Sequence, residues 1–397
     1  MTQSADFDVI VVGGGPSGAT AATDLALKGH RVLLLDKAGR IKPCGGAIPP
    51  RLMRDFDIPG HLLCAHANAA RMIAPSGKIV DMPIEGGYVG MVNRDIFDEF
   101  LRERAANSGA ERRTGEFERL EHQIDGPTLI HYVDSDGRPQ QVTTRYVIGA
   151  DGARSKVGKQ TIKGAEKIPC VFAYHEIISV PEIISGDFDP SRCDVYYQGH
   201  LSPDFYAWIF PHGSTASIGV GSAQKGFSLR GAIKDLRAAS GLDVNETVRT
   251  EGAPIPLRPL KRWDNGRDVL LAGDAAGVVA PSSGEGIYYA MVCGREAASA
   301  VSEALATGKV SALKLARKRF MKSHGKVFWV LGIMQHFWYR SDKRRERFVQ
   351  MCADPDVQYL TWQAYMNKEL VRAKPAAHAR IFLKDVGHLL GLTPSRL

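Results

Sequence analysis

The sequence lacks any stretch of about 18 uncharged apolar residues, so it predicts no membrane-spanning helix. Its six cysteines show neither CxxC nor CxH spacing, which argues against zinc or other metal sites and against a disulfide framework, and favours free thiols in a reducing compartment. The N-terminus shows no basic leader and no cleavage site, so we expect a cytoplasmic protein without an export signal. Internal repeats and low-complexity linkers are also missing.

Acidic residues are scarce in the last quarter of the chain. From Lys309 onward there are 18 Lys and Arg against 6 Asp and Glu, whereas residues 1–308 are slightly acidic. Such a basic segment predicts a surface for anions: membrane headgroups, nucleic acid or a phosphorylated ligand. No nucleic-acid-binding module accompanies it, so we expect no nucleic-acid partner.

A single dinucleotide-binding fingerprint is present. GxGxxG at 13–18 follows an apolar strand and precedes a small-residue helix. The first glycine permits a tight turn, the second lets a pyrophosphate approach the backbone, and the third lets helix and strand pack closely. The acidic residue Asp36 ends the next apolar strand, where it can accept hydrogen bonds from a ribose. The alternative is a glycine-rich turn that binds no ligand. The predicted site comprises Gly13, Gly15, Pro16, Ser17, Gly18, Asp36 and Lys37.

Two later stretches indicate which dinucleotide binds. In "GDAAG" (273–277), which follows a buried strand, the carboxylate can hold the hydroxyls of a ribityl chain. "PSSGEGI" (281–287) places two glycines at a helix start, where backbone N–H groups can stabilise the N1–C2=O region of a reduced flavin. Each stretch alone also fits a plain loop or helix cap. Together they predict FAD, held by Gly273, Asp274, Gly284, Gly286 and Ile287.

The order of the apolar stretches predicts an α/β fold of two or three structural units. Strands ending in glycine turns recur in the first and third parts of the chain, whereas residues 165–260 are rich in β-branched and aromatic residues and predict an antiparallel sheet. We expect a discontinuous Rossmann-type FAD-binding domain (1–75, 91–160 and 262–308), a substrate-binding β-sheet domain (76–90 and 161–261) and a basic helical C-terminal region (309–397).

Aromatic side chains are concentrated in "PDFYAWIFP" (203–211). The two-residue alternation of a strand would place Tyr206, Trp208 and Phe210 on one face, with Phe205 and Ile209 on the other. Three large aromatics on one face predict either a packed core or a wall against a large apolar ligand.

These motifs together resemble those of glutathione-reductase-type flavoproteins with the hydroxylase-like fold. GxGxxG at 13–18, Arg94 before "FDEFL", "DGARS" at 151–155 and "GDAAG" at 273–277 match that group over roughly residues 7–310. The resemblance implies FAD, with Arg94 and Asp151 among the residues that bind it. The group's second motif usually runs on to an arginine, where this chain has "KVGK", and this departure weakens the match at Asp151.

The chain more closely resembles the geranylgeranyl reductase family. "KPCGGAIPP" (42–50) follows the dinucleotide strand, and residues 203–211 fit the family's P-x-x-Y-x-W-x-F-P pattern. The (bacterio)chlorophyll-synthesis branch, which saturates a geranylgeranyl tail to phytyl, is the most similar. The resemblance implies an FAD-dependent, NADPH-using reductase of geranylgeranylated (bacterio)chlorophyll or geranylgeranyl diphosphate. It implies Cys44, Tyr206 and Trp208 as catalytic residues, Phe210 and Pro211 in the substrate pocket, and Cys44, Gly45 and Gly46 at the flavin.

Reducing an isolated C=C bond needs a hydride, a proton and a dry apolar pocket, because no carbonyl stabilises the developing charge. Aromatic faces tolerate transient positive charge, which suits the strand at 203–211. Cys44 is the candidate functional group near the flavin, with proton donation as one of its conceivable roles; a small buried residue filling a turn is the alternative. "GVGSAQKG" (219–226) predicts a turn, so NADPH or a reduced ferredoxin must act without a second Rossmann unit.

Residues 327–347 combine "VFWVLGIMQHFWYR" with a basic stretch, as in an interfacial helix on anionic lipid. We therefore expect peripheral association with the photosynthetic membrane; an ordinary helix that caps the substrate domain is the alternative. The basic residues are Arg340, Lys343, Arg344, Arg345 and Arg347. Two other functions remain open: a flavin monooxygenase or halogenase, since "YAWIFP" loosely resembles W-x-W-x-I-P, and a non-catalytic FAD-binding membrane protein.

Overall fold

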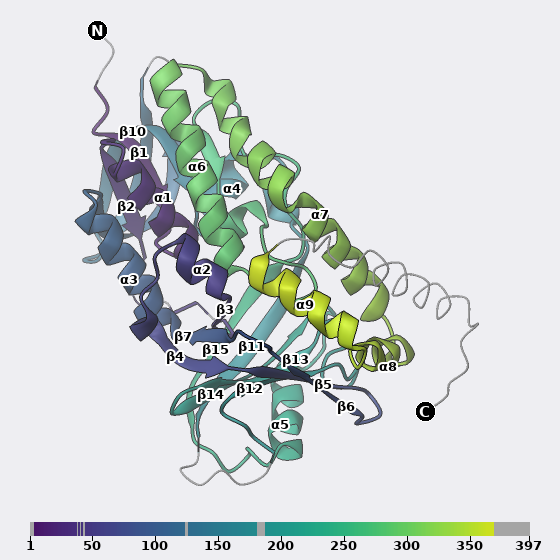
Figure 1. Ribbon diagram of the computed structural model, residues 1–397. Helices are drawn as coiled ribbons and strands as arrows, with labels where there is room; N and C mark the ends of the chain where they lie inside the picture. The colour runs from purple at the N-terminus through teal and green to yellow at the C-terminus, as the bar shows by residue number, and fades with distance from the viewer. Residues whose placement is uncertain are drawn as a thin grey trace.

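The computed structural model describes residues 4–37, 39, 41–42, 44–123, 126–180 and 187–368. These residues form two large sheets, one small sheet and the helices that cover them (Figure 1). Residues 369–397 of the expected C-terminal region lie outside the described residues, as does Pro43 in "KPCGG".

The first sheet is built on parallel strands. β1 pairs in parallel with β2 and β10, and β10 pairs in parallel with β16. Their continuous apolar stretches are typical of a sheet that is covered on both faces. The start of β8 extends this parallel part, while the remainder of β8 forms an antiparallel meander with β9 and β10. The strands are β1 (Phe7–Val12), β2 (Val32–Asp36), β8 (Glu111–Glu121), β9 (Thr128–Asp134), β10 (Pro139–Gly149) and β16 (Val269–Leu271).

Small residues let the helices pack closely around this sheet. α1 packs against α3 and α6, and the three lie together in Figure 1. A Cβ on Gly18 would lie 1.8 Å from the carbonyl oxygen of Gly13, and a Cβ on Gly294 would lie 2.2 Å from that of Ser17. The helices are α1 (Pro16–Ala26), α3 (Arg94–Asn107), α6 (Ile287–Thr307) and the shorter α2 (Pro50–Asp55) and α4 (Lys156–Thr161).

The second sheet has the order β15-β11-β14-β13-β12-β5-β6 and is antiparallel except where β12 meets β5. The antiparallel character expected for residues 165–260 is therefore correct. α5 (Leu229–Ala239) packs on one face of the sheet, beside Ala207, Ile209 and Ile218. The strands are β5 (Ala69–Ile73), β6 (Ile79–Pro83), β11 (Cys170–Ser179), β12 (Arg192–Tyr196), β13 (Ala207–His212), β14 (Thr215–Ser222) and β15 (Thr247–Pro256).

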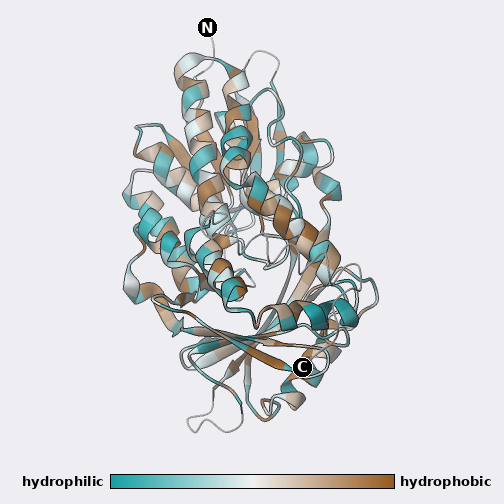
Figure 2. Cartoon of the chain, turned by 45° about the vertical axis from the view of Figure 1, so that its right-hand side comes forward, coloured by the Kyte–Doolittle hydropathy of each residue, from teal (hydrophilic) through white to brown (hydrophobic). Residues whose placement is uncertain are grey.

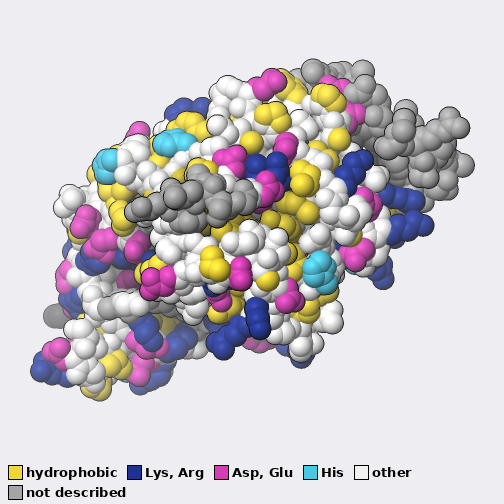
Figure 3. Space-filling view, turned by 90° about the horizontal axis from the view of Figure 1, so that it is seen from below, with side chains coloured by type: hydrophobic (Ala, Val, Ile, Leu, Met, Phe, Trp, Pro, Cys, Tyr) yellow, Lys and Arg dark blue, Asp and Glu magenta, His cyan; other side chains and the backbone are white. Residues whose placement is uncertain are grey.

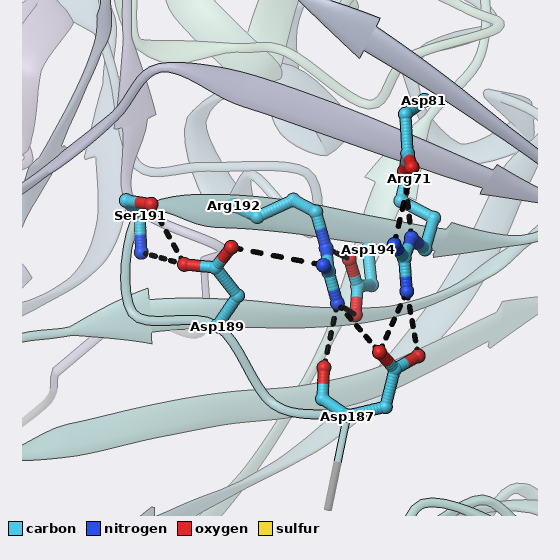
Figure 4. Close-up of polar contacts among 7 residues, drawn as sticks. All are labelled: Arg71, Asp81, Asp187, Asp189, Ser191, Arg192 and Asp194. Carbon is cyan, nitrogen blue, oxygen red and sulfur yellow. Dashed lines mark hydrogen bonds and ion pairs between the residues drawn. The ribbon is translucent and has the colours of Figure 1, made fainter. Parts of the chain in front are cut away.

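Ion pairs join the β5–β6 hairpin to the neighbouring part of the second sheet (Figure 4). Arg71 on β5 lies 2.6 Å from a carboxylate oxygen of Asp81 on β6 and 2.6 Å from one of Asp187. Arg192 on β12 lies 2.6 Å from Asp194 and also pairs with Asp187. A division of the chain into the expected units stays a proposal, but a boundary between residues 75 and 76 would split this hairpin.

A third, small sheet is formed by strands from the segments that connect the two large sheets. It consists of β3 (Ala47–Ile48), β7 (Val89–Val92) and β4 (Leu63–Ala67), with β7 in the centre. Because β3 directly follows residues 44–46, this sheet fixes the end of the segment that carries Cys44.

The long helix α7 (Lys314–Trp338) belongs to both halves of the molecule (Figure 1). Phe320 and Phe328 pack in the core of the first sheet, whereas Trp338 packs with the aromatic residues of the second. Figure 2 shows apolar residues along its second half. α8 (Asp342–Met351) and α9 (Pro355–Asn367) follow. No helix in the described ranges is long and apolar enough to cross a bilayer.

Candidate flavin and substrate site

The glycine turn between β1 and α1 forms an open cradle. Gly13 has a φ of 105°, and a Cβ there would lie 2.4 Å from the carbonyl oxygen of Ala150. A Cβ on Gly15, by contrast, would meet no atom within 4 Å, so the space beside it is free. Pro16 begins α1, and no side chain caps the helix N-terminus. The Ser17 hydroxyl is buried and has no hydrogen-bond partner among the residues that the structure describes. Open space, free N–H groups and an unpaired hydroxyl fit a bound phosphate.

Asp36 closes this turn from the end of β2. Its Oδ1 accepts a hydrogen bond of 2.8 Å from the Gly14 backbone N–H, and its Oδ2 lies 3.5 Å from the Arg102 guanidinium. Burial raises the pKa of Asp36, while the hydrogen bond and the arginine act in the opposite direction. A pocket of about 230 Å³ beside it is also lined by Lys37 and Thr114, and fits the ribose end of a dinucleotide. The Lys37 ammonium itself pairs with Glu116.

Sequence reasoning missed Gly14 and Arg102. A Cβ on Gly14 would lie 2.8 Å from both the Asp36 carboxyl carbon and Arg102 Cδ, so this position also requires glycine. The run of three glycines at 13–15 was the available signal. Arg102 lies on α3, far from the motif in sequence, and nothing in the local pattern indicates its contact with Asp36.

The third motif meets the first beside α6. Gly273 has a φ of 63°, and a Cβ there would lie 2.8 Å from Ser17 Cβ. Asp274 is buried and forms an ion pair with Lys42, a residue that the sequence did not single out. The Gly286 backbone lies alongside, since its Cβ would be 3.8 Å from Asp274 Oδ1. Ile287 then begins α6 and is buried.

Asp151 and Arg94 are both engaged by neighbouring protein groups. Asp151 accepts hydrogen bonds from the Ser155 hydroxyl at 2.5 Å and from the Lys156 N–H at 2.6 Å, which organises the start of α4. Arg94 is buried and holds Asp98 through two hydrogen bonds of 2.9 and 2.7 Å. Burial disfavours its charge, but Asp98 and the adjacent Cys44 raise the pKa of Arg94 above its ordinary value. Contact of either residue with FAD stays a prediction.

The Cys44–Gly46 segment lies directly against β13. A Cβ on Gly45 would lie 2.9 Å from Phe210 Cδ2, and one on Gly46 would lie 2.5 Å from His212 Cε1. His212, which follows Pro211 at the end of the aromatic stretch, places Nε2 3.1 Å from the Gly45 carbonyl. A carbonyl only accepts, so Nε2 carries the proton. Burial lowers the pKa of His212 to about 4 and keeps the ring neutral.

The aromatic stretch forms a wall, but its alternation is shorter than expected. β13 begins at Ala207, and the ring of Phe205 stacks on that of Tyr206 with centroids 4.3 Å apart. Phe205 therefore packs with Tyr206 and Trp208, and its expected place on the opposite face is wrong, because the turn after Pro203 ends the alternation. Ile209 does lie on the other face, toward α5.

Behind the wall lies a buried polar chain. Trp208 Nε1 donates to Ser217 Oγ at 3.1 Å, and Ser217 Oγ lies 2.9 Å from His175 Nδ1. His175 Nε2 in turn lies 2.8 Å from Glu251. Gly219 faces Trp208 across the strands. The turn expected over 219–226 is confined to residues 224–226, because residues 219–222 complete β14. The glycines at 219 and 221 make room for aromatic rings.

The cofactor loop before α6 touches this wall. The Tyr206 hydroxyl donates to the Ser283 carbonyl at 2.5 Å, and a Cβ on Gly284 would lie 3.2 Å from Phe205 Cζ. The loop predicted to hold the flavin, the Cys44 segment and the aromatic wall thus come together from three distant parts of the chain. Roles of the individual residues in binding or catalysis stay predictions.

Comparison with known proteins identifies the group to which this architecture belongs. Residues 6–170 match the family model described as FAD binding domain, and residues 226–383 match the model described as lycopene cyclase protein. A geranylgeranyl diphosphate reductase of Rhodobacter capsulatus is 58% identical over 98% of this chain and 98% of its own length. One of Synechocystis is 36% identical over 96% of this chain and 97% of its own.

The chain belongs to the geranylgeranyl reductase family. The family resemblance and the FAD-binding α/β fold expected from the motifs are therefore confirmed, and the chain binds FAD. A crystal structure described as geranylgeranyl bacteriochlorophyll reductase-like, from Thermoplasma acidophilum, shares the fold: the TM-score is 0.81 at 22% identity, covering 98% of this chain and 99% of that one. In this geranylgeranyl reductase family member, the open cradle at Gly15 and the unpaired Ser17 hydroxyl fit the diphosphate of FAD.

Proposed function

We propose that this protein saturates the double bonds of a geranylgeranyl chain to give phytyl, on (bacterio)chlorophyll or on geranylgeranyl diphosphate. The contact between Gly284 in the cofactor loop and the aromatic pair Phe205–Tyr206 carries the proposal. A flavin held by that loop would lie beside the wall, where a prenyl chain can pack. Bound FAD, once reduced, supplies a hydride to such a chain.

The pocket residues would act on the charge that develops during this reduction. Tyr206 and Trp208 are buried, with ring centroids 5.9 Å apart, and Phe210 continues the same wall 6.2 Å from Trp208. Their π faces favour a transient cation and exclude water. Cys44 would face the flavin from the segment that lies on Phe210, and Pro211 would border the pocket.

NADPH is the proposed reductant. We infer that it approaches the flavin from solvent, because the single glycine fingerprint of the sequence is assigned to FAD. Anaerobic mixing with NADPH would bleach the yellow flavin, and reduced ferredoxin in the same experiment provides the comparison. A flavin that only ferredoxin bleaches would contradict the NADPH assignment.

We further propose that α7 contacts an anionic membrane surface. Trp329 is 69% exposed and Ile333 is 48% exposed, although both are large and apolar. Exposed residues along the helix follow three- and four-residue spacing, so they form one stripe with these two in its centre. The stripe consists of Lys322, Lys326, Trp329, Ile333 and His336 on α7, and of Arg340 in the turn that directly follows the helix. Basic residues at both of its ends suit anionic headgroups.

Not every basic residue near α7 is available for the membrane contact. Arg345, one of the basic residues expected to meet lipid, is only 2% exposed and binds protein carbonyls, so it does not serve that contact. The surface seen from below, in contrast to the α7 stripe, mixes acidic, basic and apolar side chains (Figure 3). Peripheral association with the photosynthetic membrane would bring the protein to a lipid-borne prenyl substrate.

Anaerobic turnover with NADPH and each candidate substrate, followed by mass spectrometry, tests the function. We expect gains of two hydrogens per step, three steps in all, with the substrate preference separating pigment from diphosphate. Turnover that requires oxygen would indicate a monooxygenase or halogenase instead. A flavin that stays oxidised with reductant and substrate together would indicate a non-catalytic protein.

A further inference from the structure

Glu285, between the two glycines of the cofactor loop, is buried against the end of α9. Its side chain is 8% exposed, and that of Lys368, directly after α9, is 2% exposed. The Lys368 ammonium forms an ion pair with Glu285 Oε2. Glu285 Oε1 is also buried but has no hydrogen-bond partner in the described part of the chain. A buried polar atom without a partner is rare in proteins and indicates a missing ligand or a functional group.

The surroundings of Glu285 connect it to the substrate side of the site. α9 packs through Trp362, Tyr365 and Met366 on the cluster that includes Phe210 (Figure 1). The Tyr365 hydroxyl and Trp362 Nε1 are likewise buried without partners. The Lys368 ammonium lies 3.7 Å from the centre of the Tyr365 ring. Three buried polar atoms that lack a partner among the described residues, on Glu285, Tyr365 and Trp362, therefore belong to the contact of α9 with the cofactor loop and the aromatic residues.

We propose that Glu285 is the catalytic acid that protonates the prenyl double bond, and that Lys368 is a positioning residue that holds its carboxylate. This inference rests on the proposed function and names the proton donor of that reaction. The free Oε1 carries the proton toward the pocket, while Oε2 stays on Lys368.

Other polar groups near the wall either have partners or, like the unpaired Tyr365 hydroxyl and Trp362 Nε1, are far weaker acids than a carboxyl group. The Tyr206 hydroxyl donates to the Ser283 carbonyl, and the neutral ring of His212 donates to the Gly45 carbonyl. Asp274 is paired with Lys42. Glu285 is different, because one of its oxygens remains available. Its acidity also suits proton transfer better than that of a buried phenol.

Burial moves the pKa values of the two members of the pair toward each other. It raises the pKa of Glu285 and lowers the pKa of Lys368, while the attraction between the two groups opposes both shifts. A raised pKa moves the carboxyl group toward its protonated form, which is the form that a general acid requires. Among the described residues, the titratable and charged groups that face the pair are Tyr365 on α9, Tyr289 on α6, Arg51 on α2, and Tyr206 before β13.

Each double bond takes up one hydride, which reduced FAD supplies, and one proton, which Glu285 supplies. The hydride forms a C–H bond at one alkene carbon, and the π electron pair forms a second C–H bond with the proton from Glu285 Oε1. The O–H bond of the carboxylic acid breaks, and the Lys368 ammonium stabilises the carboxylate that remains. The two-electron reductant and one proton from water restore the starting state.

The variant E285Q removes the acid proton with little change of shape, and E303Q provides a matched control. Glu303 lies near the far end of α6, the helix that follows the cofactor loop, and pairs with Arg319 at 2.8 Å. In E285Q we expect FAD binding and anaerobic flavin reduction within twofold of wild type. Prenyl reduction should fall at least about 100-fold, the usual contribution of a general acid. E303Q should keep wild-type turnover.

The pH profile tests the positioning role of Lys368. In K368M the ammonium that favours the carboxylate is gone, so the pKa of Glu285 should rise further. The decline of turnover on the alkaline side should then move to higher pH, while the FAD affinity stays the same. An unchanged profile would overturn the role given to Lys368.

An infrared measurement on the FAD-loaded protein keeps the proposal testable without turnover. Wild type should show the C=O stretch of a protonated buried carboxyl that is absent from E285Q and present in E303Q. Absence of that band from wild type across the active pH range would overturn the proposal, even if E285Q failed to fold. If E285Q reduced the prenyl chain as fast as the wild-type protein, only the role of Glu285 as the acid would be overturned. If the wild-type protein did not reduce the chain at all, the proposed function itself would be overturned.

Discussion

The indole ring of Trp208 occupies the space that a side chain at Gly219 would need. A Cβ on Gly219 would lie 1.9 Å from Trp208 Cζ2, far inside contact distance. Gly221, two residues further on β14, makes similar room for Phe205 at 2.7 Å. The aromatic wall is thus set into a strand whose alternate glycines form its backing.

Gly219→Ala should displace Trp208 from this position. We expect the free energy of unfolding to fall by about 1–3 kcal/mol, because overpacking forces the ring out of its rotamer. Prenyl turnover should decline with it, whereas FAD affinity should stay near wild type. Denaturant unfolding and flavin fluorescence measure these effects. Gly60→Ala is the control, since a Cβ there meets nothing within 4 Å; equal stability of both variants would contradict the prediction.

The two faces of β13 should separate function from folding. Trp208→Leu removes a π face, and we expect turnover to fall roughly tenfold with little change in FAD binding. Ile209→Ala empties a site in the core beside α5 and should lower the free energy of unfolding by about 2–5 kcal/mol. Steady-state kinetics and denaturant unfolding on both variants decide this. The reverse pattern would indicate that the aromatic residues of this strand serve only core packing.

Cys44→Ala and Cys44→Ser test the residue beside Arg94. If the thiol acts on the flavin or substrate, turnover should fall in both variants while the flavin spectrum changes little. If Cys44 only fills the turn, the alanine variant should keep full activity. Wild-type turnover in both variants would therefore assign Cys44 to packing.

His212 should make the fold sensitive to mild acid. The unfolded chain binds a proton on this histidine below its ordinary pKa of 6.5, but the folded protein does so only below about 4. Stability is therefore lost as the pH falls from about 6.5 to 4, by up to about 3 kcal/mol. Gln at this position keeps a donor for the Gly45 carbonyl but does not titrate. Urea unfolding at several pH values should show a steeper loss for wild type than for His212→Gln.

Vesicle sedimentation tests the α7 stripe. The double variant Trp329→Ala, Ile333→Ala should partition onto phosphatidylglycerol vesicles at least roughly tenfold more weakly, because it removes most of the exposed apolar area. Leu27→Ala with Val248→Ala is a matched control, since these residues are 70% and 57% exposed but lie elsewhere. Binding should weaken with salt and on phosphatidylcholine. Equal binding of both double variants to the vesicles would argue against membrane contact through α7.

Local motifs were enough to predict the cofactor half of the molecule. GxGxxG and "GDAAG" lie where buried strands end, and strand burial is visible as apolar runs in the sequence. The turn residues of such motifs are constrained by their immediate neighbours, so a single chain reveals them. Contacts formed across long sequence distances, such as Lys42 with Asp274 and Arg102 with Asp36, left no local pattern.

The aromatic half shows where periodicity stops being informative. Alternation predicted the faces of Trp208 and Ile209 but failed at Phe205, because the strand begins two residues later. Gly219 was interpreted as part of a turn because the stretch from 219 to 226 is rich in glycine; the ring opposite it explains the glycine. Glu285 lay inside a recognised motif, yet its unpaired oxygen and its partner on α9 emerge from tertiary packing alone.

Arg345 joins the C-terminal helices to the start of the aromatic stretch. Its guanidinium binds the carbonyls of Pro203 and Tyr339, and Tyr339 in turn donates to the Ser282 carbonyl at 2.7 Å. These hydrogen bonds connect the α7–α8 junction to both the wall and the cofactor loop. If α7 rests on a bilayer as proposed, its seat on the lipid and the proposed prenyl site would share this one support, so a displacement of the helix would be felt at both the wall and the loop.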